Sequence, residues 1–176
     1  MYTYYMNTQI SPPGRARPFA WGAVQGRVEL TSSVLQAAET HAKAYFSRVK
    51  REGFSGDNVC VSSAPRWLPS PRSWFPTRAV ADLGYERASG QDFNLLATAG
   101  VDLHDDHIHG PTFVLVLFND RLKFRQGRQS HETLSGEWFI FNDKQFHGVS
   151  EINAKATTYL CVSIGLQLLG KSTALS

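Results

Sequence analysis

The second half of the chain constrains the fold most, because it consists of short apolar runs that are separated by turn residues. β-Branched and aromatic residues dominate these runs, and Gly, Asn, Asp or Ser bounds them. The runs span residues 93–97, 112–118, 122–124, 138–141 and 158–169. Short strands at this spacing, with no helical pattern between them, predict an all-β sandwich or barrel.

The first half of the chain contains one strongly periodic segment. Apolar residues recur at three- and four-residue spacing between Val34 and Val49, which is the period of a helix with one buried face. The helix is predicted to begin at Thr31 or Ser32 and to end before Gly53, a natural C-terminal stop. We expect this N-terminal helix to support the β-rich half.

Three further segments of the first half are less regular. Residues 19–30 predict one or two outer strands that break at Gly22 and Gly26, and residues 58–62 predict a short strand. Residues 64–76 contain four prolines and two tryptophans, a composition that excludes regular structure. Such a segment is either a well-packed arm or a lid on the substrate side, and the sequence leaves both interpretations open.

Size and composition indicate a single domain. A chain of 176 residues with 42% hydrophobic residues is large and apolar enough to bury one core. We expect residues 1–91 to form an N-terminal extension with the support helix and the Pro/Trp-rich segment. Residues 92–169 are expected to form the core that carries the functional site, so that 1–176 is one domain.

Net charge and the lack of targeting signals limit the kinds of partner and the location that the sequence predicts. The net charge of +3 and the pI of 9.0 are mildly basic, and the basic residues are scattered, so a nucleic-acid partner is compatible but unsupported. No signal-peptide pattern and no run of 18 apolar residues is evident, which predicts a cytoplasmic protein without a membrane partner. The two cysteines, Cys60 and Cys161, are expected to be buried free thiols.

A cluster of histidines precedes the most apolar run and invites a metal interpretation. His104 and Asp106 are two residues apart, so on a strand they project to the same face. A third ligand has to come from a neighbouring strand, and His147, 43 residues after His104, is suitably placed. Two imidazoles and one carboxylate leave three positions of an octahedron open, as in non-haem iron(II) oxygenases.

A second register of the same cluster remains open. His107 and His109 also form an i, i+2 pair, and with His147 they would make a three-histidine site of the cupin type. The first register is preferred because it supplies a carboxylate and leaves a short turn before the apolar run that begins at Thr112. No catalytic residue is predicted beyond the metal ligands.

The order of these motifs resembles the iron(II)/2-oxoglutarate-dependent dioxygenases. The similar segments are 103–106, 110–117, 136–141 and 147–149. The resemblance implies a double-stranded β-helix, that is, a jelly-roll or cupin-like barrel, with Fe(II), 2-oxoglutarate and O2 at its site. It also implies hydroxylation or oxidative demethylation of a small molecule or a side chain.

The chain departs from this family at one functional position. The family usually has an Arg about ten residues beyond the distal His to pair with 2-oxoglutarate, whereas residues 153–159 contain only Lys155 as a cation. Jumonji-type relatives use a Lys on an earlier strand instead, which makes Lys123, with Arg125 beside it, the predicted cosubstrate-binding pair. The missing Arg supports a different class as the alternative, a cupin-like metal- or ligand-binding barrel without oxygenase activity.

Overall fold

The computed structural model describes residues 24–53, 57–106, 110–150 and 158–170. Its elements, in chain order, are β1 (Gly26–Arg27), α1 (Ser32–Glu52), β2 (Asp57–Ser63), the 3-10 turn η1 (Pro71–Ser73), α2 (Thr77–Asp82), β3 (Tyr85–Arg87), β4 (Asn94–His104), β5 (Pro111–Asn119), β6 (Phe124–Gln126), β7 (Gln129–His131), β8 (Glu137–Asn142), β9 (His147–Val149) and β10 (Tyr159–Leu168). Within these residues no helix is both long and apolar enough to cross a bilayer.

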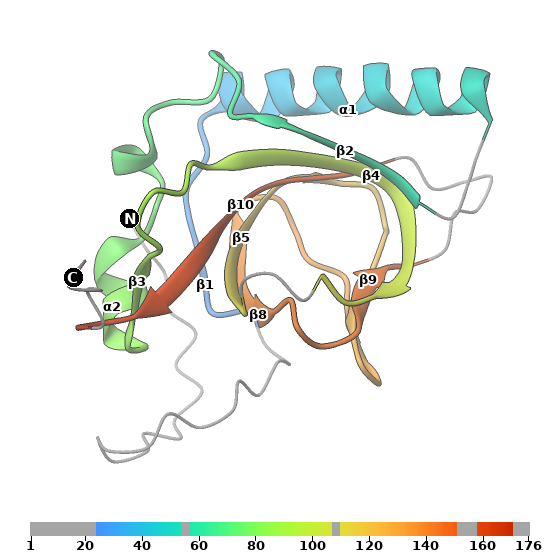
Figure 1. The fold of residues 1–176 in the computed structure, drawn as a ribbon. Helices are drawn as coiled ribbons and strands as arrows, with labels where there is room; N and C mark the ends of the chain where they lie inside the picture. The colour runs from blue at the N-terminus through green and yellow to red at the C-terminus, as the bar shows by residue number, and fades with distance from the viewer. Residues whose placement is uncertain (1–23, 54–56, 107–109, 151–157, 171–176) are drawn as a thin grey trace.

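The strands form one curled antiparallel sheet, in the order β1-β8-β5-β10-β4-β9-β6-β7. β2 also pairs with β4, and β3 pairs with β10. The long strand β4 pairs with β10 along its first half and with β9 near its end, with a register shift between Val101 and His104. β4 therefore carries the sheet around the bend, and the strands curl about a common interior (Figure 1). This is the mainly β, double-stranded β-helix fold with a flanking helix that the sequence predicts.

Two apolar clusters lie on the two faces of the curled sheet. Along β5, Phe113, Leu115 and Leu117 face α1, whereas Val114 and Val116 face the interior. Both faces of this strand are thus buried, which explains its uninterrupted apolar sequence. The outer cluster is the group that contains Phe113, Leu115 and Leu117 together with the buried residues of α1 and of the Pro/Trp-rich segment. The inner cluster is the group that faces the interior of the curled sheet. The members of the inner cluster are Val114, Val116, Leu122, Phe124, Phe139, Phe141, Val149, Tyr159 and Cys161.

The support helix is confirmed at both ends. The Thr31 side chain caps the helix by accepting a hydrogen bond from the Val34 backbone N–H, and Gly53 follows the last turn with a positive φ of 95°. The buried residues of α1 are Val34, Ala38, Ala42, Tyr45 and Val49, one stripe at helical spacing. They pack on the outer cluster, and Figure 1 shows α1 lying along β2 and β4.

The Pro/Trp-rich segment is a packed arm. Trp74 is 2% exposed, donates its indole N–H to the Pro69 carbonyl at 2.8 Å and packs edge-on against Phe93. Leu68, Trp74 and Phe75 all belong to the outer cluster, on the opposite face of the sheet from the interior. The expectation of no regular structure is wrong for Pro71–Ser73, which form one 3-10 turn.

Other expectations for the first half need correction. Gly26 does not break a strand: it lies within β1, where an added Cβ would lie 2.5 Å from the indole nitrogen of Trp138. Gly22 lies outside the described residues. The strand predicted at 58–62 is confirmed as β2, while β3, β7 and β9 are too short to show a period in the sequence. Both cysteines are free; Cys161 is buried and Cys60 is half-buried.

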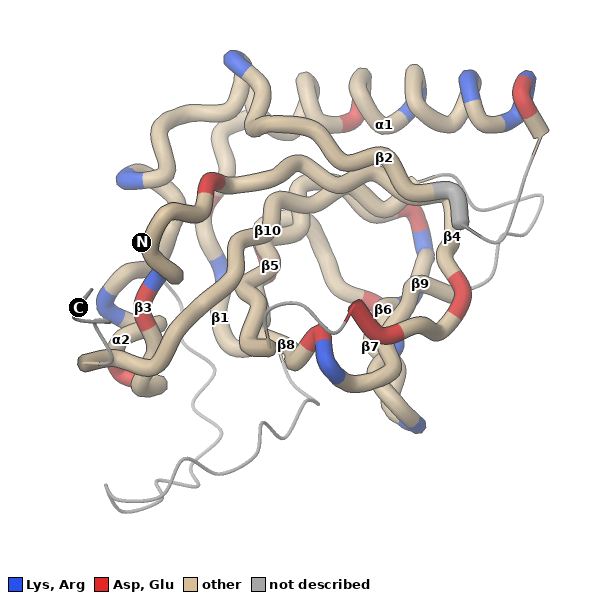
Figure 2. The backbone as a smooth tube through the Cα atoms, viewed as in Figure 1, with Lys and Arg blue, Asp and Glu red and all other residues tan. Residues whose placement is uncertain are grey.

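Figure 2 shows the charged residues on the same backbone. In this view Lys and Arg are spread over separate elements and interspersed with Asp and Glu. The scattered basic charge expected from the sequence is therefore retained in three dimensions.

Candidate metal centre

Two of the predicted ligands face each other across neighbouring strands. His104 is the last residue of β4, His147 is the first residue of β9, and they are directly paired in the antiparallel register. Their ring centroids lie 4.5 Å apart. Opposite residues of antiparallel strands project to the same face, so both imidazoles lie at the interior side of the sheet.

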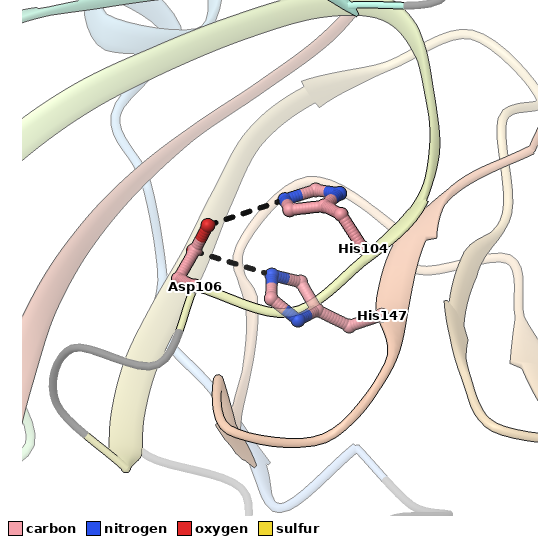
Figure 3. Close-up of side chains that lie close together, drawn as sticks. All are labelled: His104, Asp106 and His147. Carbon is pink, nitrogen blue, oxygen red and sulfur yellow. Dashed lines mark ion pairs between the residues drawn. The ribbon is translucent and has the colours of Figure 1, made fainter.

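The Asp106 carboxylate completes the group. Its Oδ1 lies 3.5 Å from His104 Nε2, and its Oδ2 lies 3.5 Å from His147 Nε2 (Figure 3). Potential ligand atoms of the three residues all lie within 4.8 Å of one another, so the group can hold one metal ion. The strand period does not produce this convergence, because β4 ends at His104; the chain beyond the strand turns the carboxylate back toward both rings.

Each histidine is held in one tautomer by the backbone. His104 Nδ1 lies 2.8 Å from the Asp102 carbonyl, and His147 Nδ1 lies 2.9 Å from the Gln145 carbonyl. Because a carbonyl oxygen only accepts hydrogen bonds, both Nδ1 atoms carry the proton. In the neutral form of each ring, Nε2 then presents a lone pair on the side of Asp106, and this is the form of imidazole that binds metals.

The site is buried on one side and open on the other. The His147 side chain is 7% exposed, whereas those of His104 and Asp106 are 38% and 45% exposed. Burial lowers the pKa of His147, and the neighbouring His104 lowers it further, against the hydrogen bond to Gln145 and the nearby Asp106. The neutral, metal-binding form of this ring is therefore favoured, and a ligand can approach from the side of Asp106.

Comparisons with known proteins find structural likeness only. No protein-family model matches the chain, and no curated protein matches it. A 2OG-Fe(II) oxygenase-family oxidoreductase from Burkholderia pseudomallei matches with 16% identity and a TM-score of 0.41, over 77% of this chain and 82% of that one. A prolyl-4-hydroxylase from Pseudomonas putida matches with 13% identity and a TM-score of 0.42, over 77% and 88%. An RmlC-like cupin protein from Desulfovibrio desulfuricans matches with 18% identity and a TM-score of 0.32, over 46% and 79%. Identities and TM-scores this low carry no information on activity.

Two aromatic rings that the sequence analysis did not single out form one wall of the metal site. The Phe141 ring lies 4.7 Å from the His147 ring, and the Phe124 ring stacks on it at 6.3 Å between centroids. Both belong to the inner cluster and shield the buried side of His147 from water. On β6 the alternation of Phe124 with the more exposed Arg125 was an available signal, whereas on β8 every residue from Trp138 to Phe141 is buried and the sequence does not mark Phe141.

A buried carboxylate that the sequence analysis missed holds the chain around Asp106. Asp143 is 3% exposed, and its backbone carbonyl accepts the Asp106 N–H at 3.0 Å. Its Oδ1 accepts the Gly110 N–H, its Oδ2 lies 3.4 Å from Thr112 Oγ1, and its own N–H donates to the Gly110 carbonyl at 2.8 Å. Asp143 therefore fastens both ends of the segment that follows the first two ligands.

A glycine brings the two histidine-bearing strands together. A Cβ at Gly148 would lie 2.8 Å from the carbonyl oxygens of both Val101 and Asp102, closer than real Cβ atoms come. The Asp102 backbone carbonyl also accepts the hydrogen bond from His104 Nδ1. The close approach of Gly148 to this carbonyl therefore sets the position of His147 relative to His104. The Gly after His147 is thus a packing requirement of the site.

The predicted cosubstrate pair lies away from this group. Phe124 and Gln126 of β6 are buried, and Lys123 is exposed, so the strand alternates with Lys123 and Arg125 on the outward face. The Lys123 carbonyl accepts the Ser150 N–H at 2.7 Å, and the Lys123 N–H donates to the Ser150 hydroxyl oxygen at 2.9 Å. Both residues share a strand face, as their spacing predicts, and it is opposite to the face of Phe124 and Gln126; the role of Lys123 and Arg125 as a cosubstrate-binding pair stays a prediction.

The alternative ligand register shares only His147 with the part of the chain that the structure describes. His107 and His109 lie outside the described residues, as does Lys155. The residues that the structure does describe bring together His104, Asp106 and His147 of the first register.

Proposed function

We propose that this protein is a mononuclear non-haem iron(II) oxygenase. The proposal rests on one observation, the convergence of His104 Nε2, His147 Nε2 and the Asp106 carboxylate within 4.8 Å of one another. Two neutral imidazoles and one carboxylate are the ligand set typical of iron(II) sites that activate dioxygen, since they leave adjacent coordination positions open. The iron supplies the oxygen chemistry, and a reducing cytoplasmic setting would keep it ferrous.

The residues of the chain supply ligation, orientation and a dry wall. Carbonyls fix both imidazoles with Nε2 toward the metal position, and Asp143 holds the segment that carries Asp106. Phe124 and Phe141 exclude water from the buried side of His147. The exposed side of Asp106 is where a small molecule or a side chain would enter for hydroxylation or oxidative demethylation.

The cosubstrate is a separate question. The sequence resemblance implies 2-oxoglutarate, whose distal carboxylate needs a cation inside the barrel. The buried polar and charged residues that the structure describes are Thr98, Thr112, Gln126, Thr133, Asp143, His147 and Thr158, with no Lys or Arg among them. The oxygenase proposal therefore rests on the metal centre, and 2-oxoglutarate, which would supply the two electrons that hydroxylation needs, stays a prediction.

The experiment separates metal, cosubstrate and activity. Protein purified without oxygen is titrated with Fe(II) by calorimetry, and 2-oxoglutarate is then added to look for a weak visible charge-transfer band. Oxygen uptake is recorded with and without the cosubstrate. One tightly bound Fe(II) that supports oxygen uptake agrees with the proposal. Iron binding without any oxygen uptake favours the alternative, a cupin-like metal- or ligand-binding barrel, and absence of iron binding contradicts the oxygenase proposal.

A further inference from the structure

A glutamine side chain lies inside the barrel beside a metal ligand. Gln126 is 4% exposed and is paired directly with His147 across β6 and β9. Its neighbouring pair, Phe124 with Val149, belongs to the inner cluster. Since paired residues of antiparallel strands share a face, and alternate residues return to the same face, the Gln126 amide projects inward next to the His147 ring.

The orientation of this amide is determined. Gln126 Nε2 lies 2.6 Å from the Asn142 carbonyl oxygen, which only accepts hydrogen bonds. The NH2 group must therefore face Asn142, and the oxygen must face the other way. Gln126 Oε1 is fully buried, and no donor in the described part of the chain reaches it.

A buried acceptor without a donor is unfavourable in an empty interior. It becomes favourable when a bound molecule supplies the missing N–H or O–H, and such groups give binding sites their selectivity. No other buried side-chain nitrogen or oxygen of the described residues lacks a partner. The single exception thus lies next to His147.

We propose that Gln126 Oε1 is a recognition group for the molecule that occupies the open positions of the metal centre. This inference rests on the proposed function. It assigns to that molecule an N–H or O–H group beside His147, and it disfavours a carbonyl or carboxylate oxygen there, because two acceptors facing each other repel. Gln126 is a specificity-determining residue, and the iron ligands do not depend on it.

The test compares two probes that share a carbon skeleton. Lactate and pyruvate both chelate a metal through a carboxylate and a neighbouring oxygen, but the neighbouring oxygen of lactate is a hydroxyl donor and that of pyruvate is an acceptor. Cobalt(II)-loaded protein is titrated with each probe, both lactate enantiomers included, and Kd is obtained from the visible spectrum. The lactate-to-pyruvate ratio of Kd values is compared between a variant and wild type. This comparison removes the intrinsic preference of cobalt for one probe, because that preference is the same in both proteins.

Two variants make the test specific. Gln126→Met keeps the length of the side chain but removes the acceptor, and the matched control Gln129→Met changes an exposed glutamine paired with Gln126 in the same hairpin. In Gln126→Met we expect the preference for lactate over pyruvate to fall by roughly five- to tenfold with cobalt affinity unchanged, the size expected for one buried hydrogen bond. Gln129→Met should behave as wild type.

The outcomes distinguish this inference from the proposed function. If wild type and Gln126→Met bind cobalt equally and show the same preference, Gln126 does not recognise the bound molecule. If Gln126→Met loses cobalt while its circular dichroism is unchanged, the amide supports the ligands instead, which also overturns the inference. If wild-type protein binds neither Fe(II) nor Co(II), the proposed function itself is wrong.

Discussion

His104 and His147 are oriented by the same contact, a hydrogen bond from Nδ1 to the carbonyl two residues earlier in the chain. The two distances are 2.8 Å and 2.9 Å, and the rings lie 4.5 Å apart on facing strands. The backbone at the end of β4 and directly before β9 thus orients the two histidine side chains at one edge of the barrel. This repeated arrangement makes the metal interpretation testable residue by residue.

Removal of any ligand should abolish metal binding. We expect His104→Ala, Asp106→Ala and His147→Ala each to weaken Fe(II) binding at least about a hundredfold, because each takes away one of three ligands. Calorimetric titration without oxygen measures the loss. His41→Gln is the control, since His41 lies on α1 beside Trp67 and should retain wild-type affinity. Retained affinity in His104→Ala would favour the register that contains His107 and His109.

Asp143→Asn should weaken the metal site indirectly. Asp143 accepts hydrogen bonds from the Gly110 N–H and the Thr112 hydroxyl, and the substitution would place an NH2 group near one of these donors. The backbone at Asp143 that holds Asp106 would then be less firmly fixed. We expect metal affinity to fall about ten- to a hundredfold and the free energy of unfolding to fall by about 1–3 kcal/mol. Calorimetry and urea denaturation measure the two effects. The exposed Asp82→Asn serves as control, and unchanged affinity in Asp143→Asn would show that the clamp does not position the ligand.

Gly148→Ala should separate the histidine-bearing strands. The added methyl group would collide with two carbonyl oxygens of β4, and strands cannot shift without moving the ligands. We expect a loss of stability of about 1–3 kcal/mol together with weaker metal binding. Thermal unfolding with and without metal measures both. A variant with lower stability but wild-type metal affinity would mean that the ligands tolerate the displacement.

Trp74→Ala should affect stability but not the metal centre. Trp74 is buried in the outer cluster, on the opposite face of the sheet from His147, so its removal leaves a cavity there. We expect the free energy of unfolding to fall by about 3–5 kcal/mol with unchanged Fe(II) affinity. A clear change in affinity would indicate that the Pro/Trp-rich segment acts as a lid after all.

Stability of the metal-free protein should fall on acidification. Burial lowers the pKa of His147 from its usual 6.5, so below that pH the unfolded chain binds a proton that the folded protein resists. The stabilising contribution is complete above pH 6.5 and is lost as pH falls below it. Wild type should therefore lose more unfolding free energy than His147→Gln between about pH 7.5 and 5.5. Urea denaturation at both values tests this, and equal losses would contradict it.

The sequence by itself determined the features that depend on local period and composition. The sequence predicts the α1 stripe from Val34 to Val49, a helix start at Thr31 or Ser32 and the apolar strand that is β5. The pairing of His104 with His147 was predicted from two motifs far apart in the chain, because few other histidines were available. These features can be read from the sequence because the spacing of side chains along a helix or strand is the same wherever that element packs.

Only the tertiary structure decided which face each side chain presents and what it meets there. Lys123 and Arg125 share a face, as their spacing predicts, yet the register of β6 against β9 turns that face to solvent and turns Gln126 to His147. Asp143 acts through contacts with residues up to 37 positions away, and no local pattern marks it. A one-residue change of register exchanges the two faces of a strand, and that register is set by packing across the whole sheet.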